Sequence, residues 1–205
     1  YAQGPKHALT SGIPGIHGSV ADLLKVPDEY KQAVASALGR RSEYVVVDSA
    51  QTGQEVLAHV KRMGGWVTVL PLDLIKSQKA NLATNILNEP GVIGLAVDLV
   101  EFQTQFEGIF YQLFGNTALI ETMSQAVATS RRHSYRPRFV TLEGETLEGY
   151  GAMTGGQNRT NVSVLGAASE VEEVESDAVR AQQQASDTRH GLDALQSELQ
   201  NILAS

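Results

Sequence analysis

The chain has 205 residues, of which 42% are hydrophobic and 19% charged, values typical of a globular protein and not of a disordered one. It contains no apolar run of 18 residues, which excludes a membrane-spanning helix, and no cysteine, which excludes disulfides, cysteine-ligated zinc and thiol nucleophiles. The net charge of −7 is uneven: residues 1–165 carry 14 Lys/Arg and 15 Asp/Glu, whereas residues 166–205 carry 2 and 8. The globular part is nearly neutral, so a local basic surface is compatible with the composition, and a cytoplasmic location is expected.

The first half of the globular part predicts a helix, a strand, a helix and a second strand. Pro27 and two acidic residues open the first helix and Gly39 closes it, as expected for helix termini. Runs rich in β-branched residues, bounded by glycine or proline, predict the strands. The four elements are expected over residues 28–38, 44–47, 54–63 and 66–70.

The second half repeats this order, with matching features 72–76 residues further on. Its helices and strands are expected over residues 106–114, 117–120, 122–132 and 139–142. Two similar halves in one chain predict a mixed α/β body made of two pseudo-symmetric subdomains. We expect the first subdomain at about 13–80, a linker at about 81–97 and the second subdomain at about 98–160.

A basic segment separates the last predicted helix from the last predicted strand. Residues 131–138 hold four arginines and one tyrosine, and an arginine pair occupies the corresponding place in the first half. Arginine beside an aromatic residue suits contact with nucleic acid, through phosphate pairing and base stacking. Cations stabilised by a helix C-terminus are an equally good interpretation. The candidate DNA-binding residues are Arg40, Arg41, Arg131, Arg132, Arg136 and Arg138.

A glycine-rich run follows at Gly149–Gly156. It differs from the dinucleotide motif G-x-G-x-x-G because its third glycine falls one residue late and no helix pattern follows directly. An α/β enzyme that binds a phosphate ligand here, with a helical oligomerisation tail, remains the alternative function. The other interpretations are a flexible turn and a close approach of two backbones, which glycine permits because it has no Cβ. The scattered histidines and the missing P-loop predict no metal, no cofactor and no catalytic residues.

The C-terminal segment has small or apolar residues at alternating steps of three and four, held over more than four heptads. This period of 3.5 is typical of one strand of a coiled coil. The alternative is an amphipathic helix that packs on the preceding domain, but such a helix usually has a wider apolar stripe. We expect the partner strand to lie upstream of Tyr1 or in another chain. The predicted seam is Val171, Val174, Ala178, Ala181, Ala185, Thr188, Leu192, Leu195, Leu199 and Ile202.

Several motifs, in order, resemble the hinge domain of bacterial-type structural maintenance of chromosomes (SMC) proteins. The segment 15–23 resembles its opening, and Leu70-Pro71-Leu72-Asp73 resembles its central motif. The segments 94–100 and 113–117 resemble the start of its second half, and Met153-Thr154-Gly155-Gly156 resembles its closing glycine motif. The family usually has two adjacent glycines before the small residue that precedes this last motif. Here Tyr150 and Gly151 stand there, which leaves the closeness of any backbone contact in doubt.

The resemblance implies a hinge over residues 1–165, the start of a coiled-coil arm over 167–205, and no enzymatic activity in this chain. It implies a homodimer formed by edge strands, in a full-length ATPase that condenses and segregates chromosomes in the cytoplasm, at the nucleoid. The hinge would join two coiled-coil arms, bind DNA weakly and help to load or entrap it; no membrane contact is expected. The implied interface residues are Tyr150, Gly151, Met153, Thr154, Gly155 and Gly156.

Overall fold

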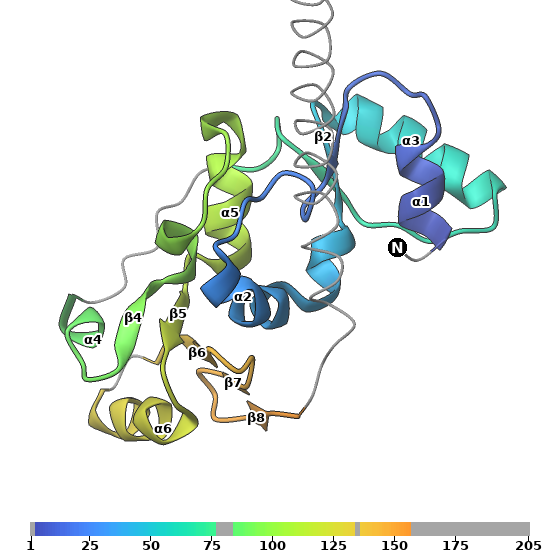
Figure 1. Cartoon of the computed structure of the whole chain (residues 1–205). Coiled ribbons are helices and arrows are strands. Elements are labelled where there is room, and N and C mark those ends of the chain that lie inside the picture. The colour runs from blue at the N-terminus through green and yellow to red at the C-terminus, as the bar shows by residue number, and fades with distance from the viewer. Residues whose placement is uncertain (1–2, 77–83, 134–135, 157–205) are drawn as a thin grey trace, which may run out of the picture. The chain divides into compact units, whose positions relative to one another are not determined.

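The computed structural model describes residues 3–76, 84–133 and 136–156 (Figure 1). The chain divides into two compact units, Tyr1–Gly166 and Ala167–Ser205. All described residues belong to the first unit. The heptad segment from Val171 to Ile202, and with it the whole predicted coiled-coil seam, lies outside the described residues.

The first half of the described chain is built on a three-stranded sheet in the order β1-β2-β3. The strands are β1 (Ile16–Ser19), β2 (Val45–Val47) and β3 (Val69–Pro71). Strand β1 runs antiparallel to β2 with a bulge, and β3 runs parallel to β2. The α-helices of this half are α1 (Gln3–Leu9), α2 (Lys31–Leu38) and α3 (Ala50–Arg62), with 3-10 turns at Asp28–Tyr30 and Gly39–Glu43.

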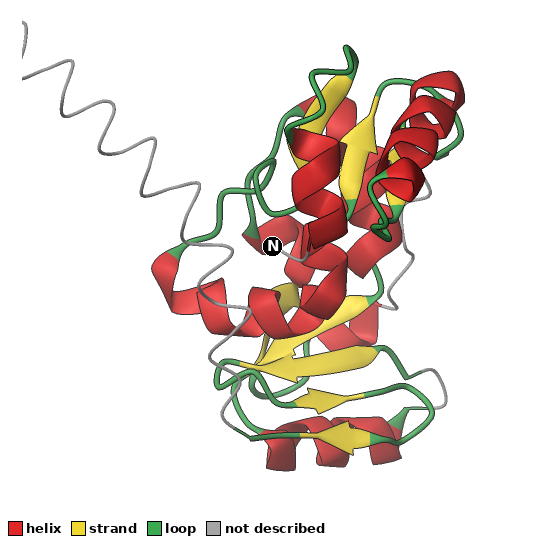
Figure 2. Cartoon of the chain, turned by 90° about the vertical axis from the view of Figure 1, so that its right-hand side faces the viewer, coloured by secondary structure: helices red, strands yellow, loops and turns green. Residues whose placement is uncertain are grey.

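The second half is built on a five-stranded sheet in the order β4-β5-β6-β7-β8. Helix α6 covers one face of this sheet, and α2 of the first half lies on the other (Figures 1 and 2). The strands are β4 (Val92–Leu95), β5 (Thr117–Ile120), β6 (Arg138–Thr141), β7 (Thr146–Leu147) and β8 (Met153–Thr154). The helices are α4 (Thr84–Leu87), α5 (Glu107–Phe114) and α6 (Met123–Arg132), with 3-10 turns at Ala96–Leu99 and Thr104–Phe106.

The predicted doubling and the mixed α/β class are confirmed by the strand pairing. Strands β4 and β5 are antiparallel and β5 and β6 parallel, as β1, β2 and β3 are. The bulge between Ile16 and Gly18 has its counterpart between Val92 and Gly94, an offset of 76 residues. The halves differ at one edge, because β7 and β8 extend the second sheet beyond β6.

One hydrophobic core joins the two halves. Val34 and Leu38 of α2 pack in the same buried cluster as Phe110 and Phe114 of α5 and Phe139 of β6. The residues of β2 alternate between this core and a smaller one. Val46 belongs to the shared core, whereas Val45 and Val47 face Val56 and Val60 of α3, as the two-residue period of a strand requires.

Helix α3 begins four residues before its predicted start at Gln54, because local hydrogen bonds stabilise its N-terminus. The Ser49 side chain accepts from the Thr52 amide at 3.2 Å. Both carboxylate oxygens of Asp73 lie within hydrogen-bond distance of the Ala50 amide, at 2.9 and 3.1 Å. The aspartate of the Leu70-Pro71-Leu72-Asp73 motif therefore caps the helix that precedes β3 in the chain.

Other expectations also differ from the structure. The strand predicted over 66–70 begins only at Val69 and includes Pro71. Proline is tolerated there because β3 is an edge strand. The segment expected as a linker, at about 81–97, contains β4, which is part of the five-stranded sheet. The glycine run contains a short strand, β8, which its sequence pattern did not predict.

Candidate interaction sites

Strand β8 forms an open edge of the five-stranded sheet. It pairs with β7 on one side, with Thr146 opposite Thr154 and Leu147 opposite Met153. The Glu148 amide donates to the Ala152 carbonyl at 2.8 Å, so the backbone groups of Ala152 and Thr154 face β7. Because these groups alternate along a strand, the amide and carbonyl of Met153 point to the open side.

Strand β3 forms an open edge of the other sheet. The Val45 amide donates to Thr68 at 3.0 Å and the Leu72 amide donates to Val47 at 2.9 Å, so the even-numbered residues of this segment face β2. The backbone groups of Val69 therefore point to the open side. Pro71 adds nothing there, because it has no amide hydrogen and its carbonyl accepts from Leu74 at 3.3 Å.

Large apolar side chains are exposed beside both edges. Tyr150 and Met153 are 83% and 59% exposed in the β7–β8 hairpin, and Leu74 is 66% exposed just after β3. Exposed backbone edges with apolar side chains favour pairing with another chain, unless charge or a covering segment prevents it. In the part of the chain that the structure describes, no strand pairs with the outer side of β3 or β8.

The glycines of this hairpin have different structural reasons. A Cβ on Gly149 would lie 2.4 Å from the Arg136 carbonyl oxygen, so no side chain fits. Gly151 and Gly156 have positive φ angles of 102° and 127°, which disfavour other residues. At Gly155 a Cβ would approach only the flexible Glu145 side chain, at 3.3 Å. Within one protomer, residue 155 therefore does not have to be glycine.

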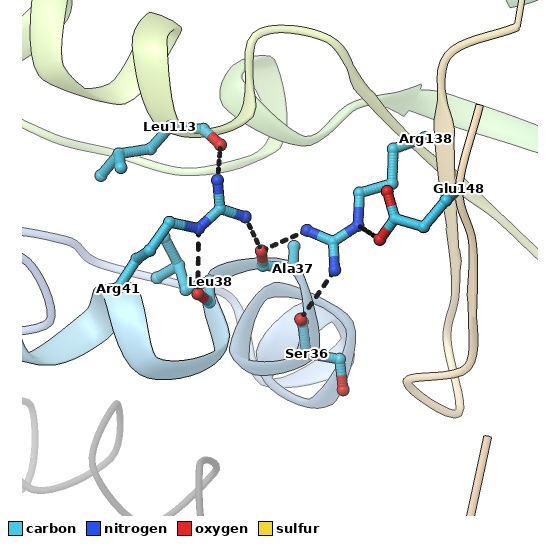
Figure 3. Close-up of polar contacts among 7 residues, drawn as sticks. All are labelled: Ser36, Ala37, Leu38, Arg41, Leu113, Arg138 and Glu148. Carbon is cyan, nitrogen blue, oxygen red and sulfur yellow. Dashed lines mark hydrogen bonds and ion pairs between the residues drawn. The ribbon is translucent and has the colours of Figure 1, made fainter. Parts of the chain in front are cut away.

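The six arginines predicted to bind DNA do not form one group in the structure. Arg41 and Arg138 direct their guanidinium groups into the protein, at the C-terminal end of α2 (Figure 3). Arg132 pairs with Glu89 at the C-terminal end of α6. Arg40, Arg131 and Arg136 are exposed, and no ion pair within the described residues involves them.

The arginine contacts at α2 connect the two halves of the body. Arg41 donates to the carbonyls of Leu38 and Ala37, at 3.2 and 2.6 Å, and to Leu113 at the end of α5, at 2.9 Å. Burial lowers the pKa of Arg41, with a further lowering by the nearby charge of Arg138. Cations at the last carbonyls of a helix stabilise it through hydrogen bonds and the helix dipole. The sequence left this interpretation open, and the structure assigns it to Arg41 and Arg138.

The first half carries an exposed tryptophan that the sequence did not predict. Trp66 is 90% exposed, and the strand assigned to it starts only at Val69. Trp66 lines a hollow together with Arg40 and Tyr44. Gly4 of α1 packs against the Trp66 backbone so closely that its Cβ would lie 1.9 Å from the Trp66 carbonyl oxygen. A lone tryptophan after two glycines was the only signal in the sequence.

Glu89, Arg132 and His133 form a polar cluster, here called the Glu89 cluster, which connects the segment before β4 to the end of α6. Glu89 contacts both Arg132 and His133, with 2.7 Å between its carboxylate and the His133 Nε2 atom. Hydrogen bonds from His133, and then from Arg132, hold the pKa of Glu89 below its ordinary value. Asn85 adds a contact of 3.3 Å to the other ring nitrogen of His133.

The comparisons with known proteins agree on one family. The model of the SMC proteins Flexible Hinge Domain matches residues 13–130. The Chromosome partition protein Smc of Lactiplantibacillus plantarum is 37% identical over 148 residues, which are 71% of this chain and 12% of that protein. The chain therefore spans about an eighth of the length of that relative.

Two solved structures have the same fold. An asymmetric dimer of the Geobacillus stearothermophilus SMC hinge domain matches with a TM-score of 0.73 and 32% identity, over 94% of this chain and 82% of that one. The Pyrococcus furiosus Smc hinge domain with an extended coiled coil matches with a TM-score of 0.63 and 29% identity, over 88% and 63%. Both are hinge domains and not ATPase heads.

Neither a membrane span nor a metal site occurs in the described part of the chain. None of its helices has the length and apolar character needed to cross a bilayer. No group of three or more possible metal-ligating side chains is present among the same residues. The described residues offer backbone edges and basic side chains as their candidate functional features.

The Glu89 cluster predicts a pH dependence of stability. A carboxyl group whose pKa is lowered by folding stabilises the native state above its unfolded pKa, and this contribution is lost as the pH falls through the folded pKa. Wild-type protein should therefore lose more thermal stability between about pH 7 and about pH 3.5 than Glu89→Gln does. Thermal unfolding followed by circular dichroism measures both, with Glu55→Gln as the surface control. Equal losses in wild type and Glu89→Gln would show that the cluster does not contribute.

Proposed function

The chain belongs to the SMC hinge-domain family, and we propose that it forms a homodimer through the open edges of β8 and β3. The observation that carries this proposal is the pair of open backbone edges, one in each half of the same protomer. In a twofold-symmetric dimer, β8 of each protomer can pair with β3 of the other, so two unlike edges are used twice. The dimer would then cover one edge of each sheet.

The described residues support this pairing in three ways. The amide and carbonyl of Met153 and those of Val69 point to the open sides. The apolar side chains exposed beside them would be buried by the same contact. Gly155 has no strict need to be glycine within the protomer, and its missing Cβ would let a second backbone approach.

We propose that the complete protein is an SMC ATPase that partitions chromosomes. The name of the L. plantarum relative supports this role. The hinge would join two coiled-coil arms, one of which starts with residues 167–205. A cytoplasmic, nucleoid-associated location follows from this role. The alternative of an α/β enzyme with a phosphate-binding glycine run is less well supported, because Gly149 and Gly151 lie in the turn between strands β7 and β8 and not between a strand and a helix.

We also propose that the hinge binds DNA weakly and contributes to its loading or entrapment. Arg40, Arg131 and Arg136 remain candidates because they are exposed. Arg40 lies in the same hollow as the exposed Trp66, which adds an aromatic surface for an unpaired base. Arg41 and Arg138 are left out of this proposed surface, because their guanidinium groups bind carbonyls within the protein.

The dimer proposal predicts the effect of adding side-chain volume at Gly155. A protomer accommodates a Cβ at this position, so Gly155→Val should leave the fold intact but weaken the dimer by about tenfold or more, through overpacking of the interface. Sedimentation equilibrium over a dilution series measures the dissociation constant. Gly94→Ala is the control, because Gly94 lies on the opposite edge strand and its Cβ would have an ordinary contact with Leu99 at 3.5 Å. An unchanged dissociation constant for Gly155→Val would refute the edge contact.

The DNA proposal predicts a change in salt dependence. Each cation that pairs with a phosphate of single-stranded DNA contributes about 0.7 to the slope of log K against log salt. Replacing Arg131 and Arg136 by serine should therefore weaken binding and reduce this slope by about 1.4. Fluorescence anisotropy with a labelled oligonucleotide gives the slope, and Lys61→Ser/Arg62→Ser on α3 removes the same charge elsewhere as control. A slope that both pairs leave unchanged would place DNA binding outside these residues.

A further inference from the structure

We propose that Arg138 and Glu148 position the β7–β8 hairpin and so determine how strongly the β8 edge binds its partner. This inference rests on the proposed dimer. It assigns Arg138 a positioning role inside the protomer, where the sequence suggested a DNA contact. The evidence is the geometry of one row of residues that crosses the sheet from β6 to β8.

Arg138, Glu148 and Ala152 lie opposite one another on three successive strands. The register of β6 and β7 pairs Phe139 with Leu147, which places Arg138 opposite Glu148. Their side chains form an ion pair, with 2.9 Å between the Arg138 Nε atom and a Glu148 carboxylate oxygen. The Glu148 amide then donates to the Ala152 carbonyl, just before β8. The ion pair therefore includes the residue that is hydrogen-bonded to Ala152, which directly precedes the strand that carries the proposed interface.

The hairpin depends on contacts of this kind because it is short. Strands β7 and β8 have two residues each, and a two-stranded hairpin has little stability of its own. At one end of β7, the Thr141 amide donates to the Glu145 carbonyl at 2.9 Å and the Glu145 amide donates to the Thr141 hydroxyl at 3.0 Å. At the other end, the Arg138–Glu148 pair provides the corresponding side-chain contact.

Arg138 also binds a rigid part of the first half. Its two terminal nitrogens donate to the carbonyls of Ala37 and Ser36 in α2, at 2.6 and 3.4 Å. Arg41 donates to the same Ala37 carbonyl and to the end of α5 (Figure 3). The side chains of Arg138 and Glu148 are only 20% and 29% exposed, so water screens this contact less than a surface ion pair. The hairpin is thereby held against a buried helix and not only against its neighbouring strand.

A double-mutant cycle on the dimer tests this role. Arg138→Met and Glu148→Gln should each raise the dimer dissociation constant about tenfold, because each removes the partly buried ion pair that orders the edge. The double variant should be no weaker than Arg138→Met alone, since both substitutions remove one shared contact. Glu89→Gln is the matched control: it alters another partly buried carboxylate–arginine pair, distant in sequence from β8, and should leave dimerisation unchanged.

Amide hydrogen exchange distinguishes positioning from a general loss of stability. In Glu148→Gln, hydrogen exchange should increase at the backbone amide of residue 148, which donates to the Ala152 carbonyl. Exchange should stay unchanged at the backbone amides of α3. A Glu148→Gln dimer as tight as wild type, or single effects that simply add, would overturn the inference. If Arg138→Met fails to fold, Glu148→Gln and Arg138→Lys decide the question. A monomeric wild type would instead refute the proposed dimer itself.

Discussion

Two open strand edges are the constraint on which the rest of the structure depends. Backbone amides and carbonyls need hydrogen-bond partners, and the groups of Val69 and Met153 point away from their own sheets. The two halves repeat one strand pattern, but only the second sheet continues with β7 and β8. The first sheet therefore lacks strands at the position where the second has them. The β8 strand of a partner could occupy this position beside β3. Two halves that differ in this way can pair with each other in a dimer, whereas two identical halves would lack the matching strand.

The two halves must keep a fixed geometry if both contacts are to form in one dimer. The shared core supplies part of this rigidity, because α2 of the first half packs with α5 and β6 of the second. Arg41 and Arg138 supply a polar contact at the same place, since both bind the Ala37 carbonyl. Removing Arg41 would also take away its hydrogen bonds to the Leu38 and Leu113 carbonyls, and a buried carbonyl without a donor is costly in a protein interior. The contacts between the two halves therefore fix the relative positions of the two open edges.

Much of this fold could be predicted from the sequence, whereas the details of the sites could not. Strand β5 and helix α6 were recognised because a β-branched run and an amphipathic segment each end at clear boundaries. Strand β8 was missed because its two residues form a strand only through pairing with β7. The arginines were ambiguous because a guanidinium that binds carbonyls and one that binds phosphate look alike in sequence. Only packing showed that Arg138 faces α2, and only the fold showed that Trp66 is exposed.

The central claim is that the globular body, and not the heptad segment, forms the dimer. The most direct measurement is the mass in solution of a chain that ends at Gly166, where the first compact unit ends. Sedimentation equilibrium at micromolar concentration gives this mass for the shortened chain and for the whole chain. The edge pairing predicts a dimer in both, with similar dissociation constants. A shortened chain that stays monomeric while the whole chain dimerises would assign the dimer to residues 167–205 and contradict the claim.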